Sequence, residues 1–182
     1  MTTTETAAGG LEQLAVKPVG YVQSDYLKPQ DVRHEHTGWT RDISRIRMEP
    51  DYAKLLGGLT GYSHIIVLFW VHKASEWKMP RGHHKPAGVK VFATRMPRRP
   101  NPIGLSVVEL LSFSTQTGEV VVKGLDALDG TPVLDIKPYI PNFDSCPTAS
   151  VPPWVAEHLN SHFHGGPHGH HHDAEKKSTP TG

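Results

Sequence analysis

The chain has little of the chemistry that stabilises secreted proteins or anchors membrane proteins. Cys146 is the only cysteine among its 182 residues, so no intrachain disulfide can form and a cytoplasmic location fits best. A single thiol also cannot build a cysteine-based metal site. The longest apolar run, 65–71, has seven residues, whereas a membrane-spanning helix needs about 20. We therefore expect no membrane span, and the first residues lack the basic start of a signal peptide.

The chain also lacks a large excess of positive or negative charge. The formal net charge is +1 at pH 7, so the whole molecule has no strong attraction for nucleic acid. Local clusters would have to supply that attraction, and the sequence has two, each of three arginines: Arg41, Arg45 and Arg47, and Arg95, Arg98 and Arg99. No G-x-G-x-x-G stretch follows a strand-like segment, which argues against a Rossmann-type nucleotide site.

Short apolar runs separated by Gly, Pro and Ser/Thr clusters predict a mainly β protein, either a sandwich or a barrel. A helix is expected over 50–56, with Pro50 in its first turn, and a second near 153–160. Residues 73–87 read as a long loop. We expect a disordered lead-in over 1–15, one folded domain over 16–160 and a disordered tail over 161–182. The expected strands are 16–23, 42–48, 63–72, 88–94, 106–113, 119–125 and 133–137.

The segment 92–106 is the most informative part of the chain. It carries Arg95, Arg98 and Arg99 among three prolines, between two strand-like segments. Proline fixes φ and removes a backbone donor, so the path of this loop is strongly restricted. Guanidinium groups offer forked sets of donors. A stiff loop with three of them predicts a binding site for anionic groups.

A second polar segment follows at 124–139. Asp129-Gly130 indicates a turn, and the apolar residues after it predict a buried strand over 133–137. Carboxylates beside such a strand can accept hydrogen bonds from ribose hydroxyls or from an adenine amino group. The residues that offer hydrogen-bonding groups here are Asp126, Asp129, Thr131, Asp135, Lys137 and Tyr139.

Both segments, together with 17–24 and the run GYSHIIVLFWVH over 61–72, resemble the TrmO (TsaA-like) family of S-adenosylmethionine-dependent methyltransferases. The resemblance covers roughly residues 17–145. It implies a single β-barrel-like domain with short helices, a homodimer and a cofactor site unlike a Rossmann fold. The implied reaction is N6-methylation of threonylcarbamoyl-adenosine at position 37 of tRNA.

The resemblance also implies roles for individual residues. Arg98, Arg99 and Lys137 would contact the substrate, and no metal is required in the core. The residue that accepts a proton is left open between Asp126, Asp129, Asp135 and Tyr139. His64 and His72, eight apart on one expected strand, would share a face, with His64 structural. The implied cofactor-binding residues are Gln30, His72, Lys73, Arg95, Asn101, Leu105, Leu125, Asp126, Ala127 and Leu128.

Two features depart from the family pattern. The family's Pro-Arg-Gln-Pro element is replaced over 25–36, where Pro29 and Gln30 are the remnant. This change is compatible with an acceptor other than tRNA, such as a small molecule linked to metal metabolism. The tail is rich in histidine, and imidazoles in such a tail can bind Ni, Co, Cu or Zn without fixed spacing. A non-enzymatic metal-binding protein is therefore a further alternative; its ligands would be His162, His164, His168, His170, His171 and His172.

Overall fold

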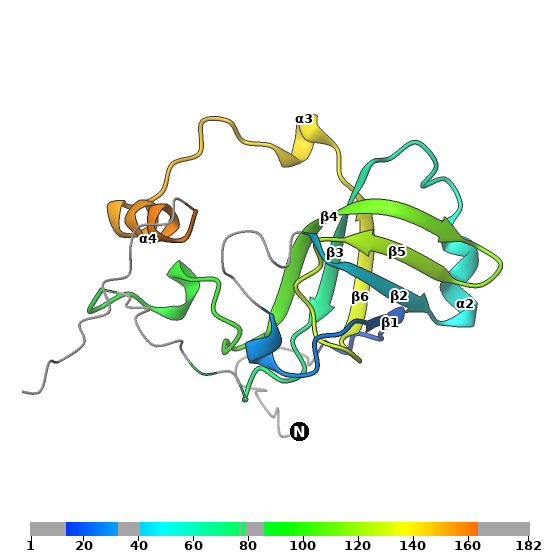
Figure 1. Cartoon of the computed structure of the whole chain (residues 1–182), viewed down its shortest axis with the longest axis horizontal. Coiled ribbons are helices and arrows are strands. Elements are labelled where there is room, and N and C mark those ends of the chain that lie inside the picture. Colours follow the sequence, from blue (N-terminus) through cyan, green and yellow to red (C-terminus); the bar gives the residue numbers. More distant parts are fainter. Residues whose placement is uncertain (1–13, 33–40, 77, 79–85, 164–182) are drawn as a thin grey trace, which may run out of the picture.

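The strands form a closed antiparallel barrel with the order β1-β2-β5-β4-β3-β6 (Figure 1). The computed structural model describes residues 14–32, 41–76, 78 and 86–163. Most of the expected lead-in and the tail from 164 onward lie outside the described residues. The strands are β1 (Gly20–Gln23), β2 (Ile43–Met48), β3 (His64–Trp70), β4 (Ile103–Ser114), β5 (Glu119–Lys123) and β6 (Pro132–Pro138). The prediction of a mainly β barrel-like domain is confirmed.

Helices are few and short. The predicted helix over 50–56 is α2 (Pro50–Ala53), which continues as a 3-10 turn, η2 (Lys54–Leu56). The helix predicted near 153–160 is α4 (Pro153–Phe163). Three elements were not predicted: η1 (Pro29–Asp31), η3 (Val91–Ala93) and α3 (Pro141–Asp144). Within the described ranges, none of the helices has the length and apolar character that a membrane span requires.

The barrel core follows from alternation along the strands. In β2, Ser44, Ile46 and Met48 point inward and Ile43, Arg45 and Arg47 point outward. β-branched residues favour this pleated, half-buried environment, and they dominate the interior. The fully buried residues are Val22, Ile46, Ile65, Val67, Val108, Val120, Val122, Leu125 and Val133.

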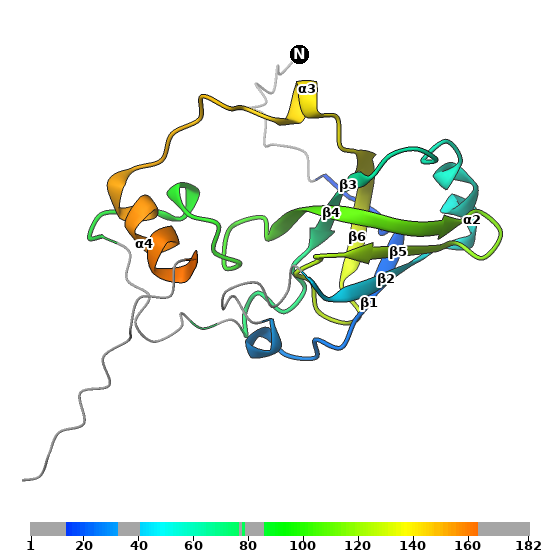
Figure 2. The ribbon, with the colours of Figure 1, turned by 45° about the horizontal axis from the view of Figure 1, so that its top comes forward.

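Strand β4 is longer than the barrel needs. Among the described strands, its first half, from Ile103 to Val108, pairs only with β3, because the pairing with β5 begins at Glu109. The free edge of this half-strand leaves backbone groups available to other segments. Figure 2 shows how β4 runs out of the barrel into the loop that precedes it.

The predicted strand over 88–94 is wrong. Gly88 has a positive φ of 86°, and residues Val91–Ala93 form a 3-10 turn, η3. Phe92 is 79 % exposed. The Thr94 hydroxyl donates to the Val91 carbonyl oxygen, 2.8 Å away, and so supports the turn. Because Val91–Ala93 adopt this turn, the alternation of apolar residues over 88–94 does not correspond to a strand of the barrel as described.

Two expectations for the strand over 63–72 are also corrected. β3 ends at Trp70, and its pairing with β6 shifts between Leu68 and Phe69. His72 therefore lies in the turn after the strand, and it does not share a strand face with His64. The run 65–71 is not buried on both faces either: Ile65 and its alternate neighbours are buried, whereas the residues between them are half-buried.

Candidate functional site

Segments far apart in the sequence enclose a cavity of about 1020 Å³. Its walls come from the end of β3 and the turn after it, the arginine loop (residues 92–101), the first half of β4 and the carboxylate loop (residues 124–131). Leu159 of α4 also lines it. In Figures 1 and 2, α4 stands away from the barrel, beside the segment that contains η3. A cavity of this size is at the upper end of the range for small-molecule sites, roughly 300–1000 Å³.

The arginine loop is braced by its own guanidinium groups. Arg95 Nη2 donates to the Leu105 carbonyl oxygen at 3.0 Å, and Arg99 Nη1 donates to the Thr94 carbonyl oxygen at 3.0 Å. The Leu105 carbonyl lies on the half of β4 that has no β5 partner, which explains why it is free to accept. Arg95 and Arg99 line the cavity, whereas Arg98 does not. Each bracing guanidinium keeps further N–H donors for a ligand.

The carboxylate loop brings Asp126 into the cavity. Asp126 Oδ1 accepts a short hydrogen bond from the hydroxyl of Ser106, which is itself buried in β4. Ala127 and Leu128 line the same wall, whereas Leu125 is fully buried in the barrel core and does not. Leu125 thus anchors the loop inside the barrel, and the three residues after it line the cavity.

Ser24 and Tyr26, just after β1, hold the carboxylate loop in place. Ser24 Oγ donates to the Ala127 carbonyl oxygen at 3.0 Å, and its backbone N–H donates to Asp129 Oδ1 at 3.2 Å. The Asp129 N–H in turn donates to the Tyr26 carbonyl oxygen at 2.7 Å. The Asp129 carboxylate thus caps Ser24 and is not part of the cavity wall.

The phenol of Tyr26 links the segment after β1 to Asp42, the residue before β2. Tyr26 is buried, and its hydroxyl donates a short hydrogen bond to Asp42. Burial and the adjacent carboxylate raise the pKa of the phenol above its ordinary value, so Tyr26 stays protonated. The Asp42 carbonyl oxygen also accepts from the Gly124 N–H at 3.0 Å, at the start of the carboxylate loop.

His72 and Lys73 form the cavity wall that follows β3. His72 Nδ1 lies 3.2 Å from the hydroxyl of Thr131, and Lys73 Nζ donates to the Leu27 carbonyl oxygen at 3.1 Å. Burial, followed by the charge of Lys73, lowers the pKa of His72 from its ordinary value of 6.5. His72 is therefore a neutral imidazole at pH 7.

Similarity to known proteins identifies the family to which this chain belongs. Residues 21–145 match the tRNA-methyltransferase O N-terminal domain. The chain belongs to this family. Its members are S-adenosylmethionine-dependent methyltransferases, so the family predicted from the sequence motifs is confirmed.

Three relatives illustrate the relationship. A probable S-adenosyl-L-methionine-binding protein of Methanothermobacter thermautotrophicus is 43 % identical over 137 residues, which cover 73 % of this chain and 95 % of the relative. The tRNA (adenine(37)-N6)-methyltransferase of Escherichia coli is 44 % identical over 106 residues, covering 54 % of this chain and 45 % of the relative. The crystal structure of TrmO from Pseudomonas aeruginosa superposes with a TM-score of 0.63 at 35 % identity. That match covers 76 % of this chain and 62 % of the solved chain, so the chain spans less than two thirds of the solved TrmO structure.

The cavity collects most of the residues that the TrmO resemblance implies, and leaves others elsewhere. His72, Lys73, Arg95, Asn101 and Leu105 line it, together with residues 126–128 and Arg99. Pro29 and Val32 line it on the side of η1, but Gln30 does not. Sequence reasoning did not select Ser24 or Ser106 as residues of the site. A serine among the apolar residues of an expected strand is the signal that could have indicated Ser106.

Three polar residues at the far end of β6 lie away from the cavity. Asp135 Oδ2 pairs with Lys137 Nζ at 2.7 Å, and Asp135 Oδ1 accepts from the Ile136 N–H at 2.9 Å. The ring of Tyr139 meets that of His64 edge to face, with centroids 6.5 Å apart. Of the four proton-acceptor candidates from the sequence, Asp126 alone lines the cavity.

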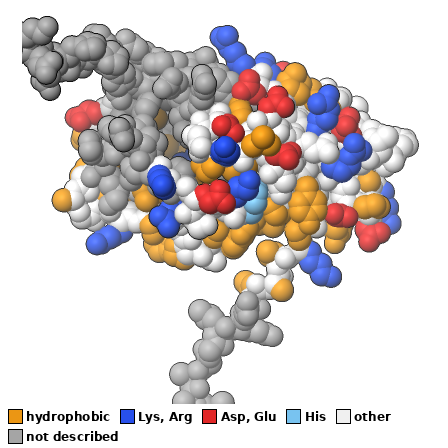
Figure 3. Space-filling model, turned by 60° about the horizontal axis from the view of Figure 1, so that its bottom comes forward, with side chains coloured by type: hydrophobic (Ala, Val, Ile, Leu, Met, Phe, Trp, Pro, Cys, Tyr) orange, Lys and Arg blue, Asp and Glu red, His pale blue; other side chains and the backbone are white. Residues whose placement is uncertain are grey.

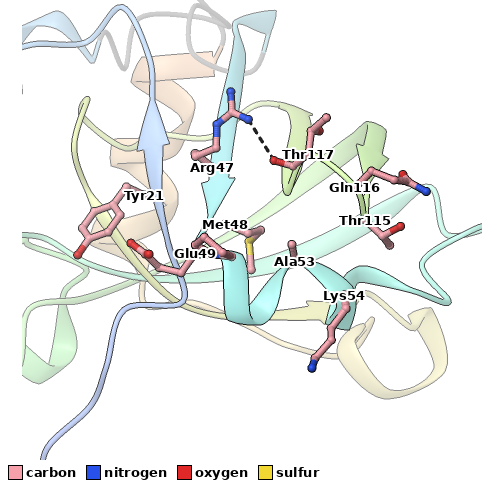
Figure 4. A pocket seen from close by; sticks show the side chains of 10 residues that line it. Tyr21, Arg47, Met48, Glu49, Ala53, Lys54, Thr115, Gln116 and Thr117 are labelled. Atoms are coloured by element: carbon pink, nitrogen blue, oxygen red, sulfur yellow. Dashed lines mark hydrogen bonds between the residues drawn. The ribbon is translucent and has the colours of Figure 1, made fainter.

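A second, smaller cavity of about 430 Å³ opens between β1, α2 and the β4–β5 turn (Figure 4). Arg47, one of the two cations that line it, points toward Thr117 and donates to the Thr117 carbonyl oxygen at 3.2 Å. Arg47 Nη2 also lies 3.6 Å from Glu119 Oε2. No residue of the predicted site lines this cavity. The larger cavity is therefore the candidate site.

The arginine cluster on β2 is partly neutralised. Glu119 Oε2 lies within ion-pair distance of both Arg45 and Arg47, at 3.8 and 3.6 Å. Figure 3 shows acidic and basic side chains interspersed over one face of the molecule, without a broad region of one sign. The arginine loop is thus the better candidate for contact with an anionic substrate.

The described residues contain no group of three or more His, Cys, Asp or Glu side chains that could hold a metal ion. The expected tail ligands from His164 to His172 lie outside the described residues, as does the side chain of His162. The metal-binding alternative therefore concerns a part of the chain that the structure does not describe.

Proposed function

We propose that this chain binds S-adenosylmethionine in the larger cavity and N6-methylates threonylcarbamoyl-adenosine at position 37 of tRNA. The observation that carries the proposal is the convergence of the arginine loop, the carboxylate loop and the free half of β4 on one cavity. The cavity offers donors, a carboxylate and apolar walls together, which suits a ligand that has a carboxylate, an ammonium group, a ribose and a base.

The residues present fit such a donor. The Asp126 carboxylate would accept from the ribose hydroxyls or the ammonium group, and the free N–H groups of Arg95 would donate to the carboxylate. Asn101 can both donate to and accept from an adenine edge. Leu105, Ala127 and Leu128, which line the cavity, would provide apolar contact for the base. When bound, the sulfonium supplies an activated methyl group, so the protein mainly has to align the acceptor and exclude water.

The acceptor would approach along the arginine loop. Arg99 lines the cavity and Arg98 lies outside its lining. Their guanidinium groups would contact phosphates beside the modified base. We also propose a homodimer. Ile103, Leu105 and Val107 line the cavity and are all exposed on the free half of β4, and a partner subunit would cover the part of this apolar row that the cofactor leaves exposed.

Calorimetric titration of S-adenosylmethionine into the full chain, with chelator present to silence the tail, tests the first step. Saturable binding near one per protomer supports the proposal, and no detectable binding contradicts it. Methyl label is then offered to tRNA with and without the threonylcarbamoyl group. Label in the modified tRNA alone supports the stated acceptor. Cofactor binding with no label in either tRNA favours a small-molecule acceptor.

Arg95→Ala should weaken S-adenosylmethionine binding about tenfold or more. The change removes a charge-assisted donor from the cavity and also the brace between the arginine loop and β4. Calorimetry on both proteins measures the effect. Arg98→Ala is the matched control, because Arg98 belongs to the same loop but does not line the cavity. Equal affinity in the Arg95 variant and the wild type would refute the assignment.

A further inference from the structure

The methyl acceptor of the proposed reaction has to lose a proton from its N6 nitrogen. The lone pair of an N6 nitrogen is delocalised into adenine and, in threonylcarbamoyl-adenosine, also into a carbonyl group. Such a nitrogen becomes a useful nucleophile as its N–H bond breaks. The cavity must therefore contain a group that can take up the proton at neutral pH.

His72 is placed and oriented for this task. It lines the cavity, and its Nδ1 is engaged at 3.2 Å with the hydroxyl of Thr131, which is only 2 % exposed. Thr131 is itself fixed, because its N–H donates to the Leu128 carbonyl oxygen at 3.1 Å. Among the described residues, the second ring nitrogen, Nε2, has no hydrogen-bond partner. An imidazole held at one nitrogen leaves the other available to a ligand.

Asp126 is less suited to the same role. It accepts from the Ser106 hydroxyl, and it lies in the loop whose backbone and apolar side chains fit the cofactor. The other carboxylate and phenol candidates, Asp129, Asp135 and Tyr139, do not line the cavity. Lys73 Nζ donates to the Leu27 carbonyl oxygen and acts as a hydrogen-bond donor in the cavity wall.

From this geometry we infer that His72 is the catalytic proton acceptor of the proposed methyl transfer, and that Thr131 positions its ring. In the step, the new N–CH₃ bond forms as the S–CH₃ bond breaks. The N–H electron pair stays on the acceptor nitrogen and the proton passes to His72 Nε2. The products are the N-methylated base, S-adenosylhomocysteine and an imidazolium, which returns its proton to water. Nδ1–H donates to Thr131 Oγ1 in this tautomer. The inference rests on the proposed function.

The charges around His72 favour the form that can accept a proton. Burial and Lys73 lower its pKa, while Glu76 and Asp129 act in the opposite direction with smaller effect. The charged groups on the other cavity walls are Arg95, Arg99 and Asp126. Because the pKa lies below the ordinary 6.5, the imidazole is neutral from pH 7 upward. kcat should therefore be level between pH 7 and 8 and fall as the pH drops below about 6.5.

The test is His72→Gln, assayed with modified tRNA and with S-adenosylhomocysteine binding measured by calorimetry. Glutamine keeps polarity but cannot take up a proton, so we expect kcat to fall about 100-fold, with loss of the acid limb of the pH profile. The Kd should stay within about threefold, because the side chain acts on the acceptor. His64→Gln is the matched control, since His64 lies at the far end of β3 and outside the cavity lining.

Other outcomes overturn the inference. An unchanged kcat of His72→Gln would contradict it. A weaker Kd for S-adenosylhomocysteine with a normal kcat at saturation would also contradict it, because His72 would then be a cofactor ligand. Thr131→Val decides the matter if His72→Gln does not fold: it should lower kcat about tenfold and move the pKa of His72 followed by NMR, while Thr131→Ser restores both. An unchanged kcat in Thr131→Val counts against the inference. Wild-type protein that binds cofactor but fails to methylate the tRNA contradicts the proposed function itself.

Discussion

Replacement of Gly20 by alanine is expected to lower the free energy of unfolding by at least about 3 kcal/mol. A Cβ at this position would lie 2.6 Å from the Arg47 carbonyl oxygen and 3.0 Å from the Met48 Cα. Both are backbone atoms of β2, the strand that Gly20 pairs with, so no side-chain rotation relieves the clash. The strands would have to separate.

Separation of β1 from β2 would also weaken the closure of the barrel between β1 and β6. β1 pairs with β6 only through Gly20–Val133 and Tyr21–Pro132, so a shift of β1 disturbs the closure of the sheet. β1 also leads directly into Ser24, which holds the carboxylate loop. Loss of cofactor binding should therefore accompany the loss of stability.

Urea unfolding followed by circular dichroism measures the effect of Gly20→Ala. Gly57→Ala is the control: its φ of −57° suits any residue, and its added Cβ would meet nothing closer than the Lys54 carbonyl oxygen at 3.4 Å. We expect that change to stay within about 0.5 kcal/mol of the wild type. A Gly20→Ala protein with an unchanged midpoint would show that β1 and β2 can adjust.

The strand predictions are correct where an alternating segment also has a partner strand in the folded barrel. The strand expected over 42–48 is β2, in which Ser44 and Ile46 are buried and Ile43 and Arg45 are exposed. The segment 88–94 has similar composition but forms a 3-10 turn. Composition describes how a segment would fit into a sheet, whereas the sheet itself requires a neighbour whose position depends on the whole fold.

The residues of the site also fall into two groups: those that a short segment predicts and those that depend on the whole fold. Arg95 and Asp126 could be chosen from local motifs, because charge and turn chemistry are visible in a short segment. Ser24 could not, because its bond to Ala127 joins residues 103 positions apart and exists only once β1 and β6 are paired. Leu125 and Asp126 were both expected in the cavity, yet Leu125 is fully buried in the barrel core, and of the two only Asp126 lines the cavity.

Asp126→Asn should weaken S-adenosylmethionine binding about 30-fold. Asparagine keeps the shape of the side chain and can still accept from Ser106 through its carbonyl oxygen. It lacks the negative charge, and hydrogen bonds to charged groups contribute roughly 1.5–3 kcal/mol, which corresponds to a factor of about 10 to 150 in Kd. The prediction isolates the charge of Asp126 from its role in packing.

Titration of the variant with two ligands identifies the partner of that charge. S-adenosylhomocysteine retains the ribose and the ammonium group but lacks the sulfonium charge. If Asp126 accepts from the ribose or the ammonium group, both ligands should lose affinity equally. A loss confined to S-adenosylmethionine would place the carboxylate beside the sulfonium instead. Asp135→Asn is the matched control, because that carboxylate pairs with Lys137 outside the cavity lining. Unchanged binding of both ligands to Asp126→Asn would exclude a role for its charge, and the carboxylate loop would then contact the cofactor through its backbone and apolar side chains alone.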